Sequence, residues 1–382
     1  MAAGAMRVVG DRVSCGLVVG PTDLAASTLD PHLRFIRGDH PIPGRGSERA
    51  GRAALDVLSA PGAQQDGQAG FALVLLSGGA SALMAVPADG LTLEDKQKTT
   101  DRLLREGVPI GELNAVRKHL SAVKGGWLAV ASSAPVVTLA ISDVVGDDPA
   151  VIGSGPTVAD TSRFVDALAI VTAAGGRRAF PEAVVARLEA GARGTLSETP
   201  KPGDPRLARS RWTLIGGRFD AMAAATLSAA ERGYRTQVRN APVVGDARQA
   251  AARWLREVTG RVNQPERWCL VSSGETTVKV TGTGRGGRNQ EFALATVETL
   301  AQLARPVALA SVGTDGVDGP TDAAGAVVRS DTLSRAAAVG LPPTSAFLAN
   351  NDSYSFFSSL GDLIKTGPTG TNVGDLQICL IG

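Results

Sequence analysis

The sequence predicts a two-domain α/β protein, and three observations support this fold class. Short β-favouring apolar runs alternate with segments of helical apolar spacing, a pattern typical of a mainly parallel sheet covered on both faces. The chain of 382 residues exceeds one comfortable hydrophobic core. Residues 191–210 are rich in Gly, Pro, Ser, Thr and charge, and interrupt the alternation as a linker would. We therefore predict domains over residues 1–205 and 206–382, with a cleft between them.

The elements of the first domain are predicted from apolar spacing, in chain order. Residues 1–9 are alanine-rich and look like the back end of a helix, so we expect the sheet to lack the strand before it. Thr92 is placed to cap a helix, with Asp95 three residues later. The remaining segments follow the alternation, with strands at 15–19, 33–36, 71–76 and 136–141 and helices at 48–58, 92–106 and 164–174.

The same alternation resumes in the second domain. The apolar runs predict strands at 213–215, 236–238, 268–272 and 307–311, and helices at 219–232, 246–258 and from about residue 289 onward. No internal repeat is evident. This half is therefore predicted to be a second α/β domain.

Composition argues against several classes of function. A net charge of +2 and an aromatic content of 4% disfavour binding to nucleic acid or to an anionic membrane. Cys15, Cys269 and Cys379 lack the spacing of a zinc site or a disulfide framework. The longest apolar stretch, residues 127–141, is too short to span a bilayer. We expect a cytoplasmic protein and leave open whether it forms a homo-oligomer.

The most informative turn follows the apolar run 71–76. Ser77, Gly78 and Gly79 end the predicted strand, and a helix-compatible run begins near Ser81. A strand that stops in glycines and reopens as a helix aims backbone N–H groups and a helix dipole at one point. That point suits a phosphate or a carboxylate, although the loop matches neither a Walker A motif nor a GxGxxG fingerprint. A plain strand-to-helix turn is the alternative.

Cations follow in the segment NAVRKHLSAVKGG. Arg117 and Lys124 fall near one face of the predicted helix, and Lys118 lies about 100° round it. A solvated helix face is the ordinary interpretation of three such cations. The adjacent Asn114 and His119 and the lack of matching acids are equally consistent with a face that binds an anion.

Acidic side chains follow the strand at 136–141. Asp143, Asp147 and Asp148 lie at its carboxyl end, where open α/β sheets bind ligands. Asp143 and Asp147 are candidate oxygen ligands for Mg²⁺. Turn formation by Gly-Asp-Asp-Pro is the alternative.

A glycine-rich segment, TGTGRGGRNQEF, is the sharpest signal in the second half. Arg285 and Arg288 stand among its glycines, just before a helix that begins near Asn289. A guanidinium beside flexible backbone N–H groups suits a phosphoryl group or a carboxylate. Asp315 and Asp318 lie on a later strand-end loop, GTDGVDGPTDAAG. Neither a Ser-His-Asp order nor a GxSxG elbow is present, which disfavours a hydrolase triad.

Taken together, these motifs resemble the glycerate 2-kinase family, also called type II glycerate kinase. Its members also carry the name hydroxypyruvate reductase, from their place in tartrate use. The segments that match follow one another over most of the chain: LLSGGASALM, TLEDKQ, LNAVRKHLSAVKGG, ISDVVGDDPAVIGSGPT, SGETTV, GRGGRNQEFALA, GTDGVDGPTDAAGAVV, NNDSYSFF and TGPTGTNVGDL. The later ones look like the family's leucine-rich C-terminal module.

The resemblance implies a Rossmann-like, three-layer N-terminal domain, a second α/β domain and an active site in the cleft between them. It implies phosphorylation of (R)-glycerate at the 2-hydroxyl, with ATP and Mg²⁺. Phosphoryl transfer needs positioning and charge neutralisation more than covalent chemistry. We accordingly assign catalysis to Arg288, Asp315 and Asp318 and the metal to Asp143 and Asp147, and we assign substrate or phosphate binding to Ser77, Gly78, Gly79, Ser81, Asn114, Arg117, Lys124, Arg285 and Asn289. Which loop takes ATP and which takes glycerate stays open.

The sequence departs from the family pattern at two places. Ala80 replaces the third glycine of the usual SGGGS loop, which leaves Gly78 and Gly79 in place. Members also carry an earlier strand and a Gly-Lys-Ala-Ala-type turn, whose lysine is thought to be catalytic, and we expect this segment to be encoded upstream of Met1. Two alternatives to the kinase therefore remain: an NAD(P)H-dependent hydroxypyruvate reductase, and a ligand-binding protein impaired in catalysis.

Overall fold

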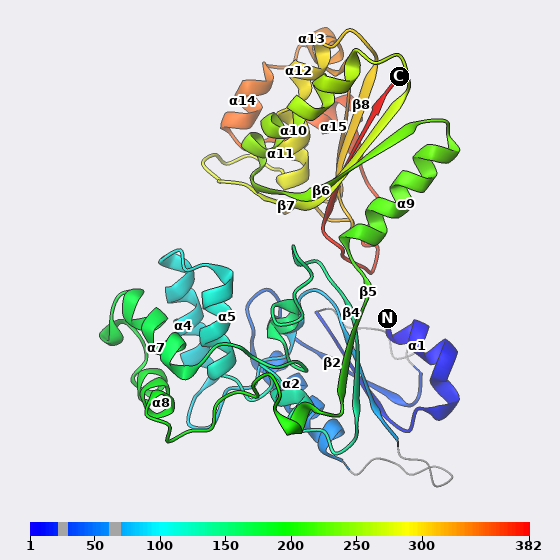
Figure 1. Ribbon diagram of the computed structural model, residues 1–382. Coiled ribbons are helices and arrows are strands. Elements are labelled where there is room, and N and C mark those ends of the chain that lie inside the picture. Colours follow the sequence, from blue (N-terminus) through cyan, green and yellow to red (C-terminus); the bar gives the residue numbers. More distant parts are fainter. Residues whose placement is uncertain (22–29, 61–69) are drawn as a thin grey trace. The chain divides into compact units, whose positions relative to one another are not determined.

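The structure, a computed structural model, describes residues 1–21, 30–60 and 70–382. These residues form two compact units (Figure 1). Unit 1 comprises Met1–Ala140 and Asp147–Ile215, and unit 2 comprises Ile141–Gly146 and Gly216–Gly382. The predicted α/β class is confirmed. The domain boundary at residue 205 and the cleft between domains stay predictions.

Unit 1 is built around parallel strands. β1 pairs with β2 in parallel, β3 pairs with β4 in parallel, and β5 lies next to β4. Helix α2 covers the first pair, because Ala50 and Ala53 pack with Ile36. The strands are β1 (Gly16–Gly20), β2 (Leu33–Arg37), β3 (Ala72–Leu76), β4 (Val136–Ile141) and β5 (Ser210–Gly216).

A separate helical cluster completes unit 1. Helices α4, α5, α7 and α8 lie together (Figure 1) around a core that includes Leu103, Val116, Phe164 and Leu188. The predicted cap of α4 is confirmed, because the N–H of Asp95 donates to Thr92 Oγ1 at 3.1 Å. The helices are α1 (Ala2–Val9), α2 (Arg45–Ser59), α3 (Ala80–Leu83), α4 (Leu93–Arg105), α5 (Ile110–His119), α6 (Trp127–Val130), α7 (Phe164–Ala173) and α8 (Glu182–Ala192), with a short 3₁₀ turn, η3, at Ile152–Ser154.

Unit 2 is a mixed sheet with helices on both faces (Figure 1). The strand order is β10-β9-β8-β11-β7-β6. Only β6 and β7 pair in parallel among the described neighbours; the other pairs are antiparallel. The strands are β6 (Arg235–Asp246), β7 (Trp268–Thr277), β8 (Val307–Gly313), β9 (Gly325–Arg329), β10 (Leu363–Ile364) and β11 (Asp375–Ile381).

The two faces of this sheet have separate cores. On one face Met222 of α9 packs on Cys269 and Val271, and on the other Trp254, Phe292 and their neighbours fill a larger core. The helices are α9 (Arg218–Glu231), α10 (Ala247–Val262), α11 (Arg288–Leu294), α12 (Val297–Ala301), α13 (Thr332–Ala338), α14 (Thr344–Ala349) and α15 (Ser353–Leu360). The sheet carries loops at its strand ends, and these loops hold the predicted site residues of this unit.

Candidate functional site

The Ser77–Ser81 loop lies directly after β3. Gly79 has φ +80°, and a side chain there would also meet the ring of His40 at 3.2 Å, so the turn requires glycine. Among the described residues, the N–H groups of Gly78 and Gly79 have no acceptor. Helix α3 spans only Ala80–Leu83, so its dipole is weaker than expected. The loop thus offers backbone donors rather than a long helix end.

A chain of hydrogen bonds joins this loop to side chains from distant segments. Lys124 Nζ donates to Ser81 O at 2.7 Å and to Ser81 Oγ at 2.8 Å. Ser81 Oγ lies 2.9 Å from Ser154 Oγ, and the Ser154 hydroxyl donates to Asn114 Oδ1 at 3.2 Å. Arg117 donates to the same Asn114 oxygen at 3.4 Å. The structure therefore brings together four predicted residues and adds Ser154.

Lys124 does not lie on the helix on which the sequence predicted it. Helix α5 ends at His119, so Lys124 lies on the following turn and not on the same helix as Arg117. That turn ends in Gly125 and Gly126, whose positive φ values of 59° and 88° stop a helix from continuing. Lys118 and Lys124 are buried rather than on a solvated face.

Three buried or half-buried cations, Lys96, Arg117 and Lys124, form what we call the cation cluster. Burial lowers the pKa of Lys124 well below its usual value, and Arg117 and Lys96 lower it further. Burial, together with Arg117, lowers the pKa of Lys96 to about 7. Within the described part of the chain, none of the three forms an ion pair with a carboxylate. The cluster therefore has no direct carboxylate partner among the described residues, and the lowered pKa values of its two lysines reflect this.

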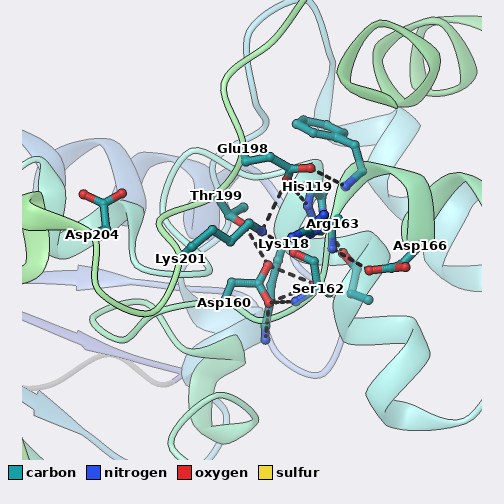
Figure 2. A network of polar contacts seen from close by, with 12 residues as sticks. Lys118, His119, Asp160, Ser162, Arg163, Asp166, Glu198, Thr199, Lys201 and Asp204 are labelled. Atoms are coloured by element: carbon teal, nitrogen blue, oxygen red, sulfur yellow. Dashed lines mark hydrogen bonds and ion pairs between the residues drawn. The ribbon is translucent and has the colours of Figure 1, made fainter. Parts of the chain in front are cut away.

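A polar network holds α5 in place (Figure 2). Asp160 accepts from Lys118 Nζ at 3.2 Å and from Thr199 Oγ1 at 2.9 Å. Burial would raise the pKa of Asp160, but the charge of Lys118 and hydrogen bonds from Ser162 and Thr199 hold it below its usual value. This network belongs to unit 1, since Lys118 is on α5, the helix that also carries Asn114 and Arg117.

The same network corrects the predicted linker. His119 Nε2 lies 3.1 Å from Glu198 Oε2, and Lys201 Nζ donates to Thr199 Oγ1 at 2.8 Å (Figure 2). Residues 198–201 are thus fastened to α5 and belong to unit 1, although their composition resembles a linker. His119, whose Nδ1 lies 2.7 Å from Ala115 O, has the contacts of a structural residue.

In unit 2, Arg288 occupies the centre of a group of carboxylates. Its Nε donates to Asp375 Oδ2 at 2.7 Å and its Nη2 donates to Asp375 Oδ1 at 3.0 Å, while Nη1 lies 3.2 Å from Glu275 Oε1. Burial would lower the pKa of Arg288, but Asp375 and Glu275 raise it. Because a fork-to-fork pair fixes a planar guanidinium, Arg288 is rigidly oriented.

Asp318 and Asn289 lie in the interior, in contrast to the roles predicted for them. The Asp318 carboxylate accepts from the N–H groups of Asn289 (3.0 Å) and Gln290 (2.9 Å), and is 2% exposed. The Asn289 side chain contacts Asp318 and Ser311. These are the contacts of a cap on α11, and a capped, buried carboxylate is poorly placed to accept a substrate proton.

The first half of the glycine-rich loop has its backbone N–H groups already bound, unlike the open loop that the sequence predicts. Asn351 Oδ1 accepts from the N–H groups of Thr281 and Gly282, at 2.8 and 3.0 Å. Asp352 Oδ1 accepts from the N–H of Arg285 at 3.0 Å, and the Arg285 side chain stacks 4.4 Å from the ring centre of Tyr354. This part of the loop is an ordered support, whereas the N–H groups of Gly286, Gly287 and Arg288 have no acceptor among the described residues.

The assignment of Asp143 and Asp147 to a metal stays a prediction. Asp143 falls in unit 2, where Asn372 Nδ2 donates to it at 3.3 Å, whereas Asp147 falls in unit 1. Partial burial and the charges of Asp375, Asp143 and Asp315 raise the pKa of Glu275. Among the residues that the structure describes, no group of three or more His, Cys, Asp or Glu side chains could hold a metal ion.

No helix in this described part is long and apolar enough to cross a membrane.

Besides Ser154, three residues of the site escaped prediction: Lys96, Glu275 and Asp375. For Lys96 the sequence did carry a signal, because it shares the buried face of α4 with Thr99 and Leu103, at helical spacings of three and seven. Asp375 begins β11, a strand outside the predicted set, and pairs with Gly313 and Gly274 on its two neighbours. Its contact with Arg288 depends on this register, which no local pattern reveals.

Comparisons with known proteins agree across the whole chain. Residues 1–189 match a family described as a domain of unknown function, DUF4147, and residues 268–375 match the MOFRL family. The chain is 38% identical to D-glycerate 2-kinase of Thermotoga maritima, covering 100% of this chain and 88% of that protein. It is 39% identical to a putative hydroxypyruvate reductase of Agrobacterium vitis, covering 92% and 78%. The crystal structure of Thermotoga maritima glycerate kinase superposes with a TM-score of 0.88 at 37% identity, covering 100% and 88% of the two chains.

Proposed function

Because this chain belongs to the glycerate 2-kinase family, we propose that it transfers the γ-phosphoryl group of ATP to the 2-hydroxyl of (R)-glycerate. The observation that carries the proposal is the match over the full chain to a glycerate kinase, in sequence and in fold together. The product is 2-phosphoglycerate, and ATP is the second substrate.

Unit 1 supplies donors and positive charge for an anionic group. A phosphate or a carboxylate would suit the N–H groups of Gly78 and Gly79, which have no acceptor among the described residues, together with the Ser81 hydroxyl, Arg117 and Lys124. Such fixed donors neutralise charge without reorganising during the reaction, which is what phosphoryl transfer requires. Asn114 orients Arg117 and Ser154.

Unit 2 supplies a fixed guanidinium and an accessible carboxylate. We assign Arg288 to the transferring phosphoryl group, because Asp375 holds its planar fork. Asp315 is partly exposed, with one oxygen 3.1 Å from the N–H of Val317, and is the better base than the capped Asp318. Asp315 would accept the proton of the 2-hydroxyl as that oxygen attacks phosphorus.

Magnesium is expected to enter as a complex with ATP. Mg²⁺ keeps several waters and is commonly held by phosphate oxygens with one or two carboxylates. The scattered carboxylates of the described residues do not form a complete site for an ion, so no step of the proposal depends on a metal held by the protein alone.

A second function, reduction of hydroxypyruvate, is suggested by the name of the Agrobacterium vitis relative. The turn after β3 is Ser77-Gly78-Gly79, without the GxGxxG sequence of a dinucleotide site. The two functions separate in parallel assays on the purified protein. One couples ADP formation with (R)-glycerate and Mg²⁺, and the other follows NADH and NADPH oxidation with hydroxypyruvate. We expect turnover in the first; hydride transfer without ADP formation would refute the kinase.

A further inference from the structure

The cation cluster of unit 1 is buried or half-buried, and none of its three side chains is ion-paired with a carboxylate of the described residues. Lys96 and Lys124 are 6% and 2% exposed, and the charge of Arg117 lowers the pKa of both lysines. The charge of Glu48 raises the pKa of Lys96, but Glu48 is itself paired with Arg52 at 2.7 Å. Burying an ammonium group without a counter-charge costs free energy, which lowers its pKa, and a bound anion would favour the charged form again.

Lys96 shares a carbonyl acceptor with the segment that precedes Lys124. Its Nζ donates to Val86 O at 3.2 Å, and the same oxygen accepts from Ser121 Oγ at 3.2 Å and from the N–H of Ala122 at 3.1 Å. An ammonium group has three donors, so two on Lys96 lack an acceptor among the described residues. A structural lysine would be expected to satisfy them.

The number of donors in and around the cluster distinguishes between the two anionic groups of the reaction. A carboxylate has two oxygens, whereas a phosphate monoester has three acceptor oxygens and a charge of about −1.5 to −2. The Gly78 and Gly79 N–H groups, the ammonium of Lys124 on Ser81 and the two remaining donors of Lys96 suit the larger acceptor set of a phosphate.

We propose that the Ser77–Ser81 loop and the cation cluster form a phosphate subsite, and that Lys96 is a binding residue of it. The inference rests on the proposed function, since it assigns to phosphate a site that the reaction leaves open between phosphate and carboxylate. The phosphate comes either from the nucleotide or from the phosphorylated product, and separate ligands identify which.

The test compares Lys96→Met, which keeps the length of the side chain, with the wild-type full chain. Titration calorimetry measures the binding of ADP, 2-phosphoglycerate and (R)-glycerate, and thermal denaturation measures the ligand-free stability. Lys98→Met is the matched control, since Lys98 lies on the exposed face of the same helix in an i,i+4 pair with Glu94. Lys96→Gln, which keeps a donor for Val86 O, is the second variant if Lys96→Met does not fold.

We expect Lys96→Met to weaken one of the two phosphate-bearing ligands by at least about 10-fold, as the loss of a charge-assisted hydrogen bond implies. Glycerate affinity should change less than about 3-fold, by the same conversion. The ligand that weakens identifies the source of the phosphate. The ligand-free variant should also melt at a higher temperature, because an unpaired buried cation has been removed.

Three results would overturn the inference: unchanged binding of both phosphate ligands, an equal loss for glycerate, or a lower melting temperature with every ligand weakened. The last would mark Lys96 as a structural residue. The kinase proposal is tested separately, because wild-type protein that lacks kinase activity could still bind phosphate through Lys96. Conversely, an active kinase whose Lys96 variants bind normally would refute only the subsite.

Discussion

At the scale of single residues, two cations have opposite environments. Arg288 is compensated by Asp375 and Glu275, whereas Lys96 is buried with a single hydrogen bond to Val86 O. The first arrangement fixes the direction of a guanidinium, and in our proposal the second leaves ammonium donors for a ligand. Each arrangement leads to a prediction.

Replacement of Arg288 by Lys should lower kcat by roughly 10²-fold or more, because the charge remains but the planar fork that would contact the phosphoryl group is lost. Steady-state kinetics with ATP and (R)-glycerate measure the effect. Arg335→Lys is the matched control, since Arg335 makes a similar bond to the buried carboxylate of Asp362, at 2.8 Å. Both variants should lose stability, but only Arg288→Lys should lose turnover; a near-normal kcat in it would refute the assignment.

The lowered pKa of Lys96, about 7 in the folded protein against 10.5 as the usual value, predicts a pH dependence of stability. Between these values the unfolded chain binds more protons, so the free energy of unfolding rises with pH from about 7 to 10. Burial lowers the pKa of Lys96, and the charges of Arg117 and Arg187 lower it further, whereas the charge of Glu48 raises it. Lys124 is the other charged group that interacts with Lys96 in the cluster. Urea denaturation from pH 6 to 10 should show that, as pH rises, the free energy of unfolding of the wild type increases relative to that of Lys96→Met. A constant difference would contradict the assignment.

Residue identity was predicted better from the sequence than residue environment. Ser81, Asn114, Arg117 and Lys124 were predicted together and lie in one hydrogen-bonded chain. The sequence placed Asp318 in a strand-end loop, as the structure does. Its hydrogen bonds to the start of α11 depend on tertiary contacts, which the sequence does not show. The burial of Lys96 and the partner of Arg288 depend likewise on contacts between distant segments, which one sequence does not show.

At the scale of elements, helix α5 is the part on which unit 1 depends. It carries Asn114 and Arg117 toward the site and Lys118 toward Asp160, so one helix joins the site to the polar network (Figure 2). The capped start of α4 could be predicted because the signal is local. The contacts of residues 198–201 with unit 1 could not be predicted, because the composition of this segment is that of a linker.

Breaking the network at Asp160 should destabilise the protein by about 3–5 kcal/mol, since Lys118 would remain buried without a counter-charge. Asp160→Ala, Lys118→Met and the double variant form a thermodynamic cycle, measured by urea denaturation. The double variant should be more stable than Asp160→Ala alone, because it removes the stranded cation. Strictly additive losses would show that the pair is not coupled.

At the scale of the whole molecule, the sequence predicted the α/β class and the family, and missed the pairing in unit 2. Long ordered motifs identify a family because they span most of the chain. The alternation of strands and helices predicted the parallel pairs of unit 1, but β11 lies between β7 and β8 and runs antiparallel to both. Its neighbours are distant in sequence, so pattern alone does not place it.

The central claim is that the chain phosphorylates glycerate at the 2-hydroxyl, and phosphorus NMR of the reaction tests it most directly. Purified protein is incubated with ATP, Mg²⁺ and (R)-glycerate, and the product is compared with authentic 2- and 3-phosphoglycerate. We predict loss of the γ-phosphate signal with growth of the 2-phosphoglycerate signal alone, and no such signal from the Arg288→Lys variant over the same time. Formation of 3-phosphoglycerate, or an unchanged ATP spectrum from folded wild-type protein, would contradict the claim.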